Sequence, residues 1–495
     1  MVPETHHSQG DAHRPSPVGQ TSEHAAGPKT ACVLDLEEIL VTVIDELASR
    51  LSGGRLITDR GVVDAYRRDQ AHLVEPGAPL AVLLAETVRD VSVALAWAHE
   101  HGIPVVPRGA GSGLAGGATA TEGCLVLSTE RMNAIREVSA EDQLAVVEAG
   151  VINADVDRAA TEVGLMYAPD PSSFEISTIG GNLATNAGGL RCVKYGVTRD
   201  SVLGLEVVLA DGRIIQTGRR TVKGVAGYDL TSLFVGSEGT LGVITSATLK
   251  LRPRPVAEPV TVVGSFPSLR SAAEAVSGIV RQGLGPSLLE LIDQNTLRAI
   301  NEWKNMGLDH ETAAMLVAQA DGVDATACAA ALGAQFEAAG ADFVAISSDP
   351  AEAAQLLEIR RLAFPAAERL GQCLVEDVAV PRSKLPEMFE QLEQTAARHG
   401  VRVLTVAHAG DGNLHPVFIF DRTADGSVPD NIWAAADEVF RTALDLGGTL
   451  TGEHGVGVLK RRWLELELGP DVMDVHRSIK NALDPTGILN PGKGF

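Results

Sequence analysis

Apolar and polar positions alternate differently in the two halves of this chain. Up to about residue 255, short apolar runs separated by glycine-rich segments predict strands, and helical spacing predicts an amphipathic helix at 34–51. The strands are expected at 80–85, 103–107, 124–129, 144–150, 202–212 and 239–255, with a helix at 88–101 that Gly102 ends.

Beyond Pro259 the pattern changes to alanine-rich amphipathic stretches. Helices are expected at 268–283 and 324–340, between strands at 261–266 and 314–321. This is an α+β pattern, and the last 40 residues are largely helical. A length of 495 residues exceeds one ordinary core, so several domains are expected. We place a disordered polar tail at 1–30, a first domain at 31–255, a second at 256–455 and a C-terminal segment at 456–495.

Composition excludes several classes of protein. The formal net charge of −23 argues against a nucleic-acid partner, whose phosphates would be repelled. No apolar run reaches the roughly 18 residues of a transmembrane helix. The five cysteines are scattered without a Cys-x-x-Cys pair, which predicts neither an iron–sulfur cluster nor a disulfide framework and fits a reducing cytoplasm.

A glycine-rich segment at 107–118, PRGAGSGLAGGA, contains a formal G-x-G-x-x-G pattern. In a dinucleotide-binding fold this pattern opens a helix, but here an apolar strand follows. Residues without side chains still let several backbone N–H groups converge on an anion, and Arg108 adds a positive charge. The alternative is a flexible surface loop.

Two further segments favour a large ligand. The stretch 170–200 is long and nearly free of regular periodicity, and loops of that length in a compact domain are usually functional. A second cluster of small residues stands at 233–245 between apolar runs. Together they predict backbone that lies close to a bound molecule.

The segment HAGDGNLHP, 408–416, predicts a metal site. Asp411-Gly412 is a strong hairpin signal, and a tight two-residue turn would place His408 directly opposite His415 on one face. Glu453, in GEHGVG, is the expected third ligand, because two imidazoles and a carboxylate suit a divalent metal with open positions. The alternative is that each histidine is an ordinary sheet residue.

These motifs together resemble a known family. PRGAGSGLAGG, TIGGNLATNAGG…KYG, GSEGTLGVIT and GILNPGK are similar to the FAD-binding domain of the vanillyl-alcohol oxidase/p-cresol methylhydroxylase (PCMH) superfamily. With HAGDGNLHP and TGEHGVG, residues 50–495 resemble its FAD-linked D-2-hydroxyacid dehydrogenase branch, which includes D-lactate dehydrogenases and the glycolate oxidase flavoprotein subunit. The resemblance implies an α+β fold with a two-subdomain PCMH-type FAD-binding domain, a ferredoxin-like cap (substrate) domain and a C-terminal helical segment that returns to the flavin domain.

The resemblance also implies the residues that hold FAD. Those matching the pyrophosphate loop are Arg108, Gly109, Gly111, Ser112 and Gly113. Those expected to line the flavin or adenine are Pro169, Asp170, Ser172, Thr178, Gly181, Asn182, Gly188, Tyr195, Gly196, Glu238, Gly242 and Ile244. Asn490 and Lys493 would close over the cofactor from the tail. Relatives with covalent flavin can carry a histidine where this chain has Ser112, which favours non-covalent FAD.

The same resemblance implies the chemistry. Residues matching His408, His415 and Glu453 hold a divalent metal (zinc or manganese), and His454 is the base that takes the hydroxyl proton while hydride passes from Cα to flavin N5. Arg360, in the helix expected at 349–364, is the candidate for the substrate carboxylate. Its neighbour Arg361 is the other possibility, and an exposed Arg360 pairing with Glu358 is the structural alternative.

The expected substrate is a small D-2-hydroxy acid, D-lactate or glycolate. Family members that bind a second carboxylate have polar or basic residues at the positions of Val375 and Val417, which argues against the alternative substrate D-2-hydroxyglutarate. Two other classes stay open, a metal-dependent hydrolase and a flavin-binding protein without turnover. The electron acceptor (quinone, cytochrome, electron-transfer flavoprotein or oxygen) and the oligomeric state, with a homodimer as one expectation, are not determined. The expected location is cytoplasmic, with peripheral membrane attachment through an acceptor partner as an alternative.

Overall fold

The computed structural model describes residues 36–494, so the predicted disordered tail at 1–30 lies outside the described residues. The chain divides into Met1–Asp45 and Glu46–Phe495, and the strands of the described residues all lie in the second part. Helix α1, Leu36–Arg50, spans the division where a helix was predicted. None of the helices within 36–494 has the length and apolar character needed to cross a bilayer.

The first sheet has four strands in the order β1-β2-β4-β3, and β2, β3 and β4 run parallel. Its elements are β1 (Arg55–Ile57), β2 (Ala81–Leu84), β3 (Val105–Arg108), β4 (Leu125–Ser128), α2 (Arg60–Val63) and α3 (Val88–His101). Helix α3 begins with a capping box at Thr87 and Asp90 and ends at Gly102, whose φ is 66°. The glycine-rich loop connects β3 to β4, so a strand follows it, as the sequence predicts.

The second sheet is antiparallel, with five strands in the order β5-β6-β10-β8-β9. Its strands are β5 (Ile135–Ser139), β6 (Leu144–Glu148), β8 (Val202–Val208), β9 (Ile214–Gly218) and β10 (Val243–Lys250), and a small pair joins β7 (Leu165–Met166) to β11 (Arg252–Pro253). The associated helices are α4 (Asn153–Thr161), α5 (Ile179–Thr185), α6 (Cys192–Tyr195) and α7 (Leu230–Phe234). The stretch at 170–200 is therefore not a continuous loop, because two helices too short to show periodicity interrupt it.

The chain from β12 to α14, called here the cap region, forms one mainly antiparallel sheet of eight strands. Its strands are β12 (Val260–Phe266), β13 (Leu288–Asp293), β14 (Ala314–Ala320), β15 (Phe343–Ser347), β16 (Gln372–Val375), β17 (Val378–Ala379), β18 (Arg402–His408) and β19 (Asn413–Phe420). Four of them lie in the order β15-β12-β14-β13, with α8 and α10 as crossovers, which is the ferredoxin-like arrangement. Strands β18, β19 and β16 continue the sheet beyond β13.

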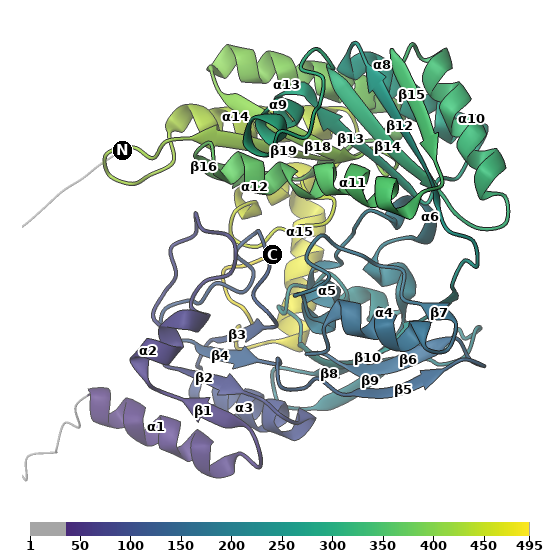
Figure 1. Ribbon diagram of the computed structural model, residues 1–495. Coiled ribbons are helices and arrows are strands. Elements are labelled where there is room, and N and C mark those ends of the chain that lie inside the picture. The colour runs from purple at the N-terminus through teal and green to yellow at the C-terminus, as the bar shows by residue number, and fades with distance from the viewer. Residues whose placement is uncertain (1–35, 495) are drawn as a thin grey trace, which may run out of the picture. The chain divides into compact units, whose positions relative to one another are not determined.

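Alternating residues of these strands feed two cores on opposite faces of the sheet. One core packs against α8 (Leu269–Gln282), α10 (Ala325–Ala338), α13 (Leu385–His399) and α14 (Asp430–Asp445). The other packs against α9 (Gln294–Lys304), α11 (Pro350–Arg361) and α12 (Ala363–Glu368). Figure 1 shows α11 and α12 following one another across this second face.

The last helix, α15 (Leu464–Leu483), leads the chain back to the first sheet. There Leu489 forms a parallel bridge with Val105 of β3, and Val105 N–H donates to Ile488 O at 2.8 Å. The C-terminal return implied by the family resemblance is therefore present.

Candidate functional site

The two histidines of HAGDGNLHP lie on the β18–β19 hairpin, but not in the predicted register. His408 is opposite Asn413, and His415 is opposite Val406. The predicted two-residue turn is wrong: the connection contains the four residues 409–412. It closes because the N–H groups of Asp411 and Gly412 both donate to His408 O, at 3.0 and 3.1 Å, before Gly412 takes a φ of 81°.

The error in register does not separate the two side chains. The shift is an even number of residues, so His408 and His415 stay on the same face of the sheet. Their ring centroids are 5.0 Å apart, and both side chains are buried. The predicted proximity of His408 and His415 is therefore present, although the turn predicted to cause it is wrong.

Glu453 lies between the two imidazoles. Its Oε1 is 3.2 Å from His408 Nε2 and 3.2 Å from His415 Nε2. Burial alone would raise the pKa of Glu453. The charge of His408, together with the hydrogen bonds that Glu453 makes with His408 and His415, holds this pKa well below its ordinary value. The carboxylate is therefore ionised and faces two ring nitrogens.

A buried chain of charges extends from His408 to Arg360. His408 Nδ1 is 2.7 Å from Glu290 Oε1, and Arg360 Nε donates to Glu290 Oε2 at 2.8 Å. Burial alone would raise the pKa of Glu290, but His408 and Arg360 lower it. Burial alone would lower the pKa of His408, but Glu290 and Glu453 raise it. Arg361 is exposed, so Arg360 is the arginine that reaches the cluster. The Nη atoms of Arg360 have no hydrogen bond to the Glu290 carboxylate, which accepts from Nε.

Glu290 was not predicted as a site residue. It is the only charged residue in the otherwise apolar run at 288–292, and it is fully buried on β13. A single carboxylate within a buried strand was the available sequence signal, because burying it is costly unless it is paired.

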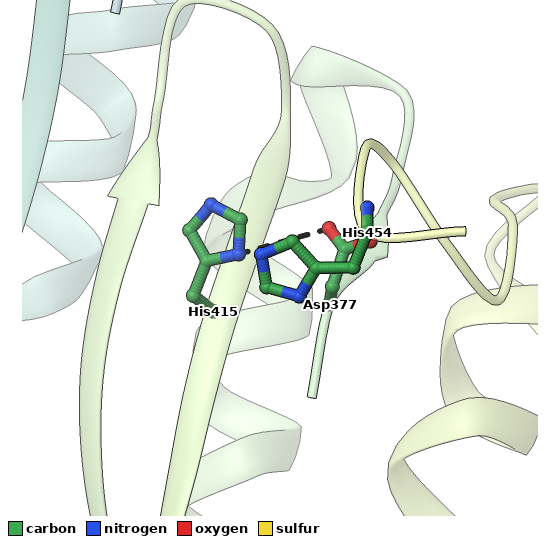
Figure 2. A group of neighbouring side chains, drawn as sticks. All are labelled: Asp377, His415 and His454. Atoms are coloured by element: carbon green, nitrogen blue, oxygen red, sulfur yellow. Dashed lines mark hydrogen bonds and ion pairs between the residues drawn. The ribbon is translucent and has the colours of Figure 1, made fainter. Parts of the chain in front are cut away.

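Asp377 organises the other side of the cluster (Figure 2). Its Oδ2 accepts from the N–H groups of Glu453 and His454, at 3.0 and 2.9 Å, and from Thr451 Oγ1 at 2.7 Å. Lys460 Nζ, also buried, lies 3.5 Å from Oδ2 and donates to Asp377 O at 2.9 Å. Asp377 therefore fixes the backbone on which Glu453 and His454 stand.

His454 packs directly on His415. Their rings stack with centroids 4.9 Å apart and an interplanar angle of 12° (Figure 2). Burial lowers the pKa of His454 to about 4, so its imidazole is neutral at pH 7. Neither His415 Nδ1 nor His454 Nδ1 has a hydrogen-bond partner within residues 36–494.

Two overlapping sets of side chains have ligand atoms close enough to share a cation. One is His408, His415 and Glu453; the other is Asp377, His415 and His454. The carboxylate of Asp377 is already occupied by backbone and side-chain donors, including Asn413 Nδ2 at 2.6 Å from Oδ1. Two imidazole nitrogens and the ionised Glu453 form the better donor set, with Asp377 3.7 Å behind His415 Nδ1.

The segments predicted to hold a cofactor also meet in space. At Gly109 a Cβ would overlap the hydroxyl of Thr178, the residue that caps α5, so the glycine loop passes directly over this helix. Near this junction, Asn153 Oδ1, Ser177 Oγ and Asn182 Nδ2 are buried without a partner among the described residues. Close backbone and unsatisfied polar atoms fit a large polar ligand such as FAD.

Three predicted cofactor residues use their polar side-chain atoms on the protein itself. Glu238, with a φ of 51°, accepts from the N–H groups of Val456 and Gly457 at 2.7 and 2.8 Å. Asn490 Nδ2 donates to Glu238 O, and Lys493 donates to Asn490 Oδ1 at 2.9 Å and to a backbone carbonyl. These residues tie the tail and the GEHGVG segment to the glycine loop.

The remaining predicted residues occupy several environments. Arg108 donates to Arg68 O at 2.8 Å, and Tyr195 donates to Asp321 of the cap region at 2.6 Å. Gly188 contacts the cluster, because a Cβ there would overlap the Glu453 carboxylate. Gly242 and Ile244 lie in or beside the core of the second sheet, and Gly181 lies in helix α5. The others lie along loops: Gly111, Ser112, Gly113, Pro169, Asp170, Ser172 and Gly196.

Comparison with known proteins gives the family. The model for "FAD binding domain" matches residues 79–218, and the model for "FAD linked oxidases, C-terminal domain" matches residues 256–494. The glycolate oxidase subunit GlcD of Bacillus subtilis is 44% identical over 84% of this chain and 89% of its own length. A D-lactate dehydrogenase of Archaeoglobus fulgidus is 37% identical over 87% of this chain and 95% of its own.

Solved structures confirm the fold. The 4-ethylphenol oxidase of Gulosibacter chungangensis aligns with a TM-score of 0.75 at 20% identity, over 93% of this chain and 98% of that chain. p-Cresol methylhydroxylase aligns with a TM-score of 0.74 at 18% identity, over 92% and 96%. The fold is thus the predicted PCMH-type α+β fold, and the chain belongs to the family of FAD-linked oxidases.

Proposed function

We propose that this protein oxidises a D-2-hydroxy acid to the 2-oxo acid, using non-covalent FAD and a divalent metal, zinc or manganese. Curated relatives named glycolate oxidase subunit and D-lactate dehydrogenase support the reaction class. The observation that carries the proposal is the cluster itself: Glu453 between His408 and His415, with a neutral His454 stacked on His415 and Arg360 held by Glu290.

Each residue has a distinct part in this proposal. His408, His415 and Glu453 hold the metal, which when bound supplies a Lewis acid for the substrate hydroxyl. Bound FAD supplies the acceptor for the hydride from Cα. Arg360 binds the substrate carboxylate through the Nη atoms that Glu290 does not use. His454 accepts the hydroxyl proton, because its lowered pKa keeps a ring nitrogen free at neutral pH.

The site favours a substrate with a single carboxylate. Val375 of β16 lies opposite Val417 of β19, so the two positions at which related enzymes carry polar or basic residues form one apolar pair here. A second carboxylate placed there would be desolvated without a partner. D-lactate and glycolate are accordingly the first substrates to test.

An anaerobic assay tests the proposal. D-lactate or glycolate should bleach the visible absorbance of the purified flavoprotein, L-lactate should not, and removal of metal by a chelator should abolish bleaching until zinc or manganese is restored. A protein that keeps full activity after chelation would refute the metal assignment. A flavoprotein that none of these hydroxy acids reduces would refute the oxidation.

A further inference from the structure

A cavity of about 320 Å³ lies at the outer edge of the cap sheet, beside strand β16. Its apolar wall combines Leu73 and Leu114, from the side of the glycine loop, with Phe364 and Val375 of the cap region. At the ~30 Å³ that one water occupies in the liquid, it has room for about ten water-sized groups. The cavity is thus much larger than a methyl group.

The order of strands sets the direction from the cluster to this cavity. Along the sheet the neighbours are β13, β18, β19 and β16, which carry Glu290, His408, His415 and Val375 respectively. Val375 is opposite Val417, which is two residues from His415 and therefore on the same face. The cluster thus has Arg360 with Glu290 on one side and the cavity wall on the other.

The helices above this face give the same direction. Arg360 near the end of α11 and Phe364 in α12 are four residues apart, and Leu362 between them keeps helical dihedral angles. Four helical residues advance about 6 Å. Helix α12 packs on β16 and β19, so Phe364 lies towards the cavity. Helix α11 packs on β12, and Arg360 near its end reaches Glu290.

The charges of the wall restrict what can enter. The polar residues that line the cavity are Gln70, His72, Glu368 and Gln372. None of the lining residues is a lysine or arginine, and the carboxylate of Glu368 would repel a second acid group. An uncharged apolar group would displace water at little cost. The wall therefore selects against a dicarboxylate.

Resting on the proposed function, we propose that this cavity is the subsite for the substrate side chain. The preferred substrate is then a D-2-hydroxy monocarboxylate whose apolar side chain is longer than a methyl group. Its carboxylate lies at Arg360, its hydroxyl at His408, His415 and Glu453, and its side chain passes Val375 into the cavity.

The test measures binding separately from turnover. Titration calorimetry of the holoenzyme with pyruvate, 2-oxobutyrate, 2-oxohexanoate and 2-oxoglutarate reports binding of the product series. Anaerobic flavin reduction by the corresponding D-2-hydroxy acids reports oxidation. We expect Kd to fall by up to about fourfold for each added methylene, and 2-oxoglutarate to bind at least about tenfold more weakly than 2-oxohexanoate.

Val375→Phe should fill the entrance and weaken binding of 2-oxohexanoate at least about tenfold more than binding of pyruvate, so that the gain with chain length is lost. Val344→Phe on β15, the opposite edge strand, is the matched control and should keep the whole series. If Val375→Phe does not fold, Phe364→Ala should still reduce the gain with chain length. Equal loss for short and long acids, or no dependence on length in the wild type, would overturn the subsite.

The two measurements separate this inference from the proposed function. Binding that strengthens with length, without flavin reduction by any acid, would retain the subsite and refute the oxidation. Flavin reduction by every acid without a dependence on length would retain the oxidation and refute the subsite.

Discussion

The glycine-rich segments and the histidine cluster are built in opposite ways. Around the glycine loop the protein brings backbone close to backbone, as where Gly109 passes over Thr178, and leaves polar atoms such as Asn182 Nδ2 unsatisfied. In the cluster, charged side chains are buried and paired with one another from Arg360 through Glu290 and His408 to Glu453. The first region depends on the absence of side chains and the second on their charge.

This contrast predicts that the two regions fail separately. A substitution in the cluster should remove chemistry or metal while FAD stays bound, whereas an added side chain in the glycine loop should expel FAD while the cluster survives. A mutation that removes both functions at once would mean that the two regions form one cooperative structure.

The largest effect is expected for His454→Ala. It removes the proposed base and leaves the three proposed metal ligands in the chain, so the rate of anaerobic flavin reduction by D-lactate should fall about 10²- to 10⁴-fold. FAD absorbance and metal content should match the wild type. His310→Ala, in the loop after α9, removes another histidine of the cap region and should leave the rate unchanged. Loss of flavin or metal in His454→Ala would show a structural role instead.

Asp377→Asn should destabilise the cluster from behind. The change removes the nearer of the two carboxylates beside buried Lys460, the other being Glu376 at 4.0 Å, and removes a charged acceptor for the N–H groups of Glu453 and His454. Breaking a buried pair in this way costs about 3–5 kcal/mol, which urea unfolding would measure. Zinc affinity of the folded fraction should fall about 10- to 100-fold, as for other carboxylates behind metal-binding histidines.

The matched variant for this pair is Lys460→Met. Combined with Asp377→Asn it should recover part of the lost stability, because no single charge is then left unpaired. Strict additivity of the two losses would contradict the coupling between Asp377 and Lys460.

The fold could be predicted from the sequence because apolar runs and glycine-rich motifs are local signals that recur along the chain. The strands expected from apolar runs are present within a few residues of their predicted bounds, whereas others, such as β5, β13 and β15, were not predicted. The strand after the glycine loop separated this fold from a dinucleotide-binding one. It failed where spacing along the chain is a poor guide to contact in space. In the observed hairpin Gly410 N–H donates to Leu289 O of β13, a contact 121 residues away along the chain that no turn rule includes.

The residues that support the cluster could not be predicted either, because they are far from it along the chain. Glu290 and Lys460 meet it only through the tertiary fold, and neither belongs to a recognisable motif. The proposed ligands could be predicted because HAGDGNLHP and GEHGVG are compact. Their partners are dispersed over β13, the connection between β16 and β17, and the segment after Leu459.

Gly109→Val should break the other region. A side chain there would overlap Thr178, and overpacking of this kind costs about 1–3 kcal/mol. FAD should bind roughly 10- to 100-fold more weakly, measured by the ratio of flavin to protein absorbance after gel filtration, while zinc content is retained. Gly53→Ala, where a Cβ meets only ordinary contacts, is the control. Retention of FAD by Gly109→Val would show that this contact does not shape the cofactor site.

The smallest expected effect is on the pH dependence of stability, through the buried carboxylate of Glu376. Glu376 adjoins Asp377 and is equally buried, but neither of its carboxylate oxygens has a hydrogen-bond partner among the described residues, and Lys460 is 4.0 Å away. Burial raises the pKa of Glu376 from 4.5 to about 7, so the folded protein holds a proton that the unfolded chain releases. Stability should therefore fall as the pH rises from about 4.5 to 7, and the full penalty should persist above pH 7.

Glu376→Gln removes that penalty and should stabilise the protein by about 1–3 kcal/mol at pH 8, with little change at pH 4.5. Urea unfolding at both pH values measures this difference, with the exposed Glu302→Gln on α9 as the control. A loss of stability at pH 8 would mean that the Glu376 charge is paired in the folded protein. Glu376 would then belong to the same network of paired charges as Asp377, and the contrast in hydrogen bonding between the two carboxylates would not hold.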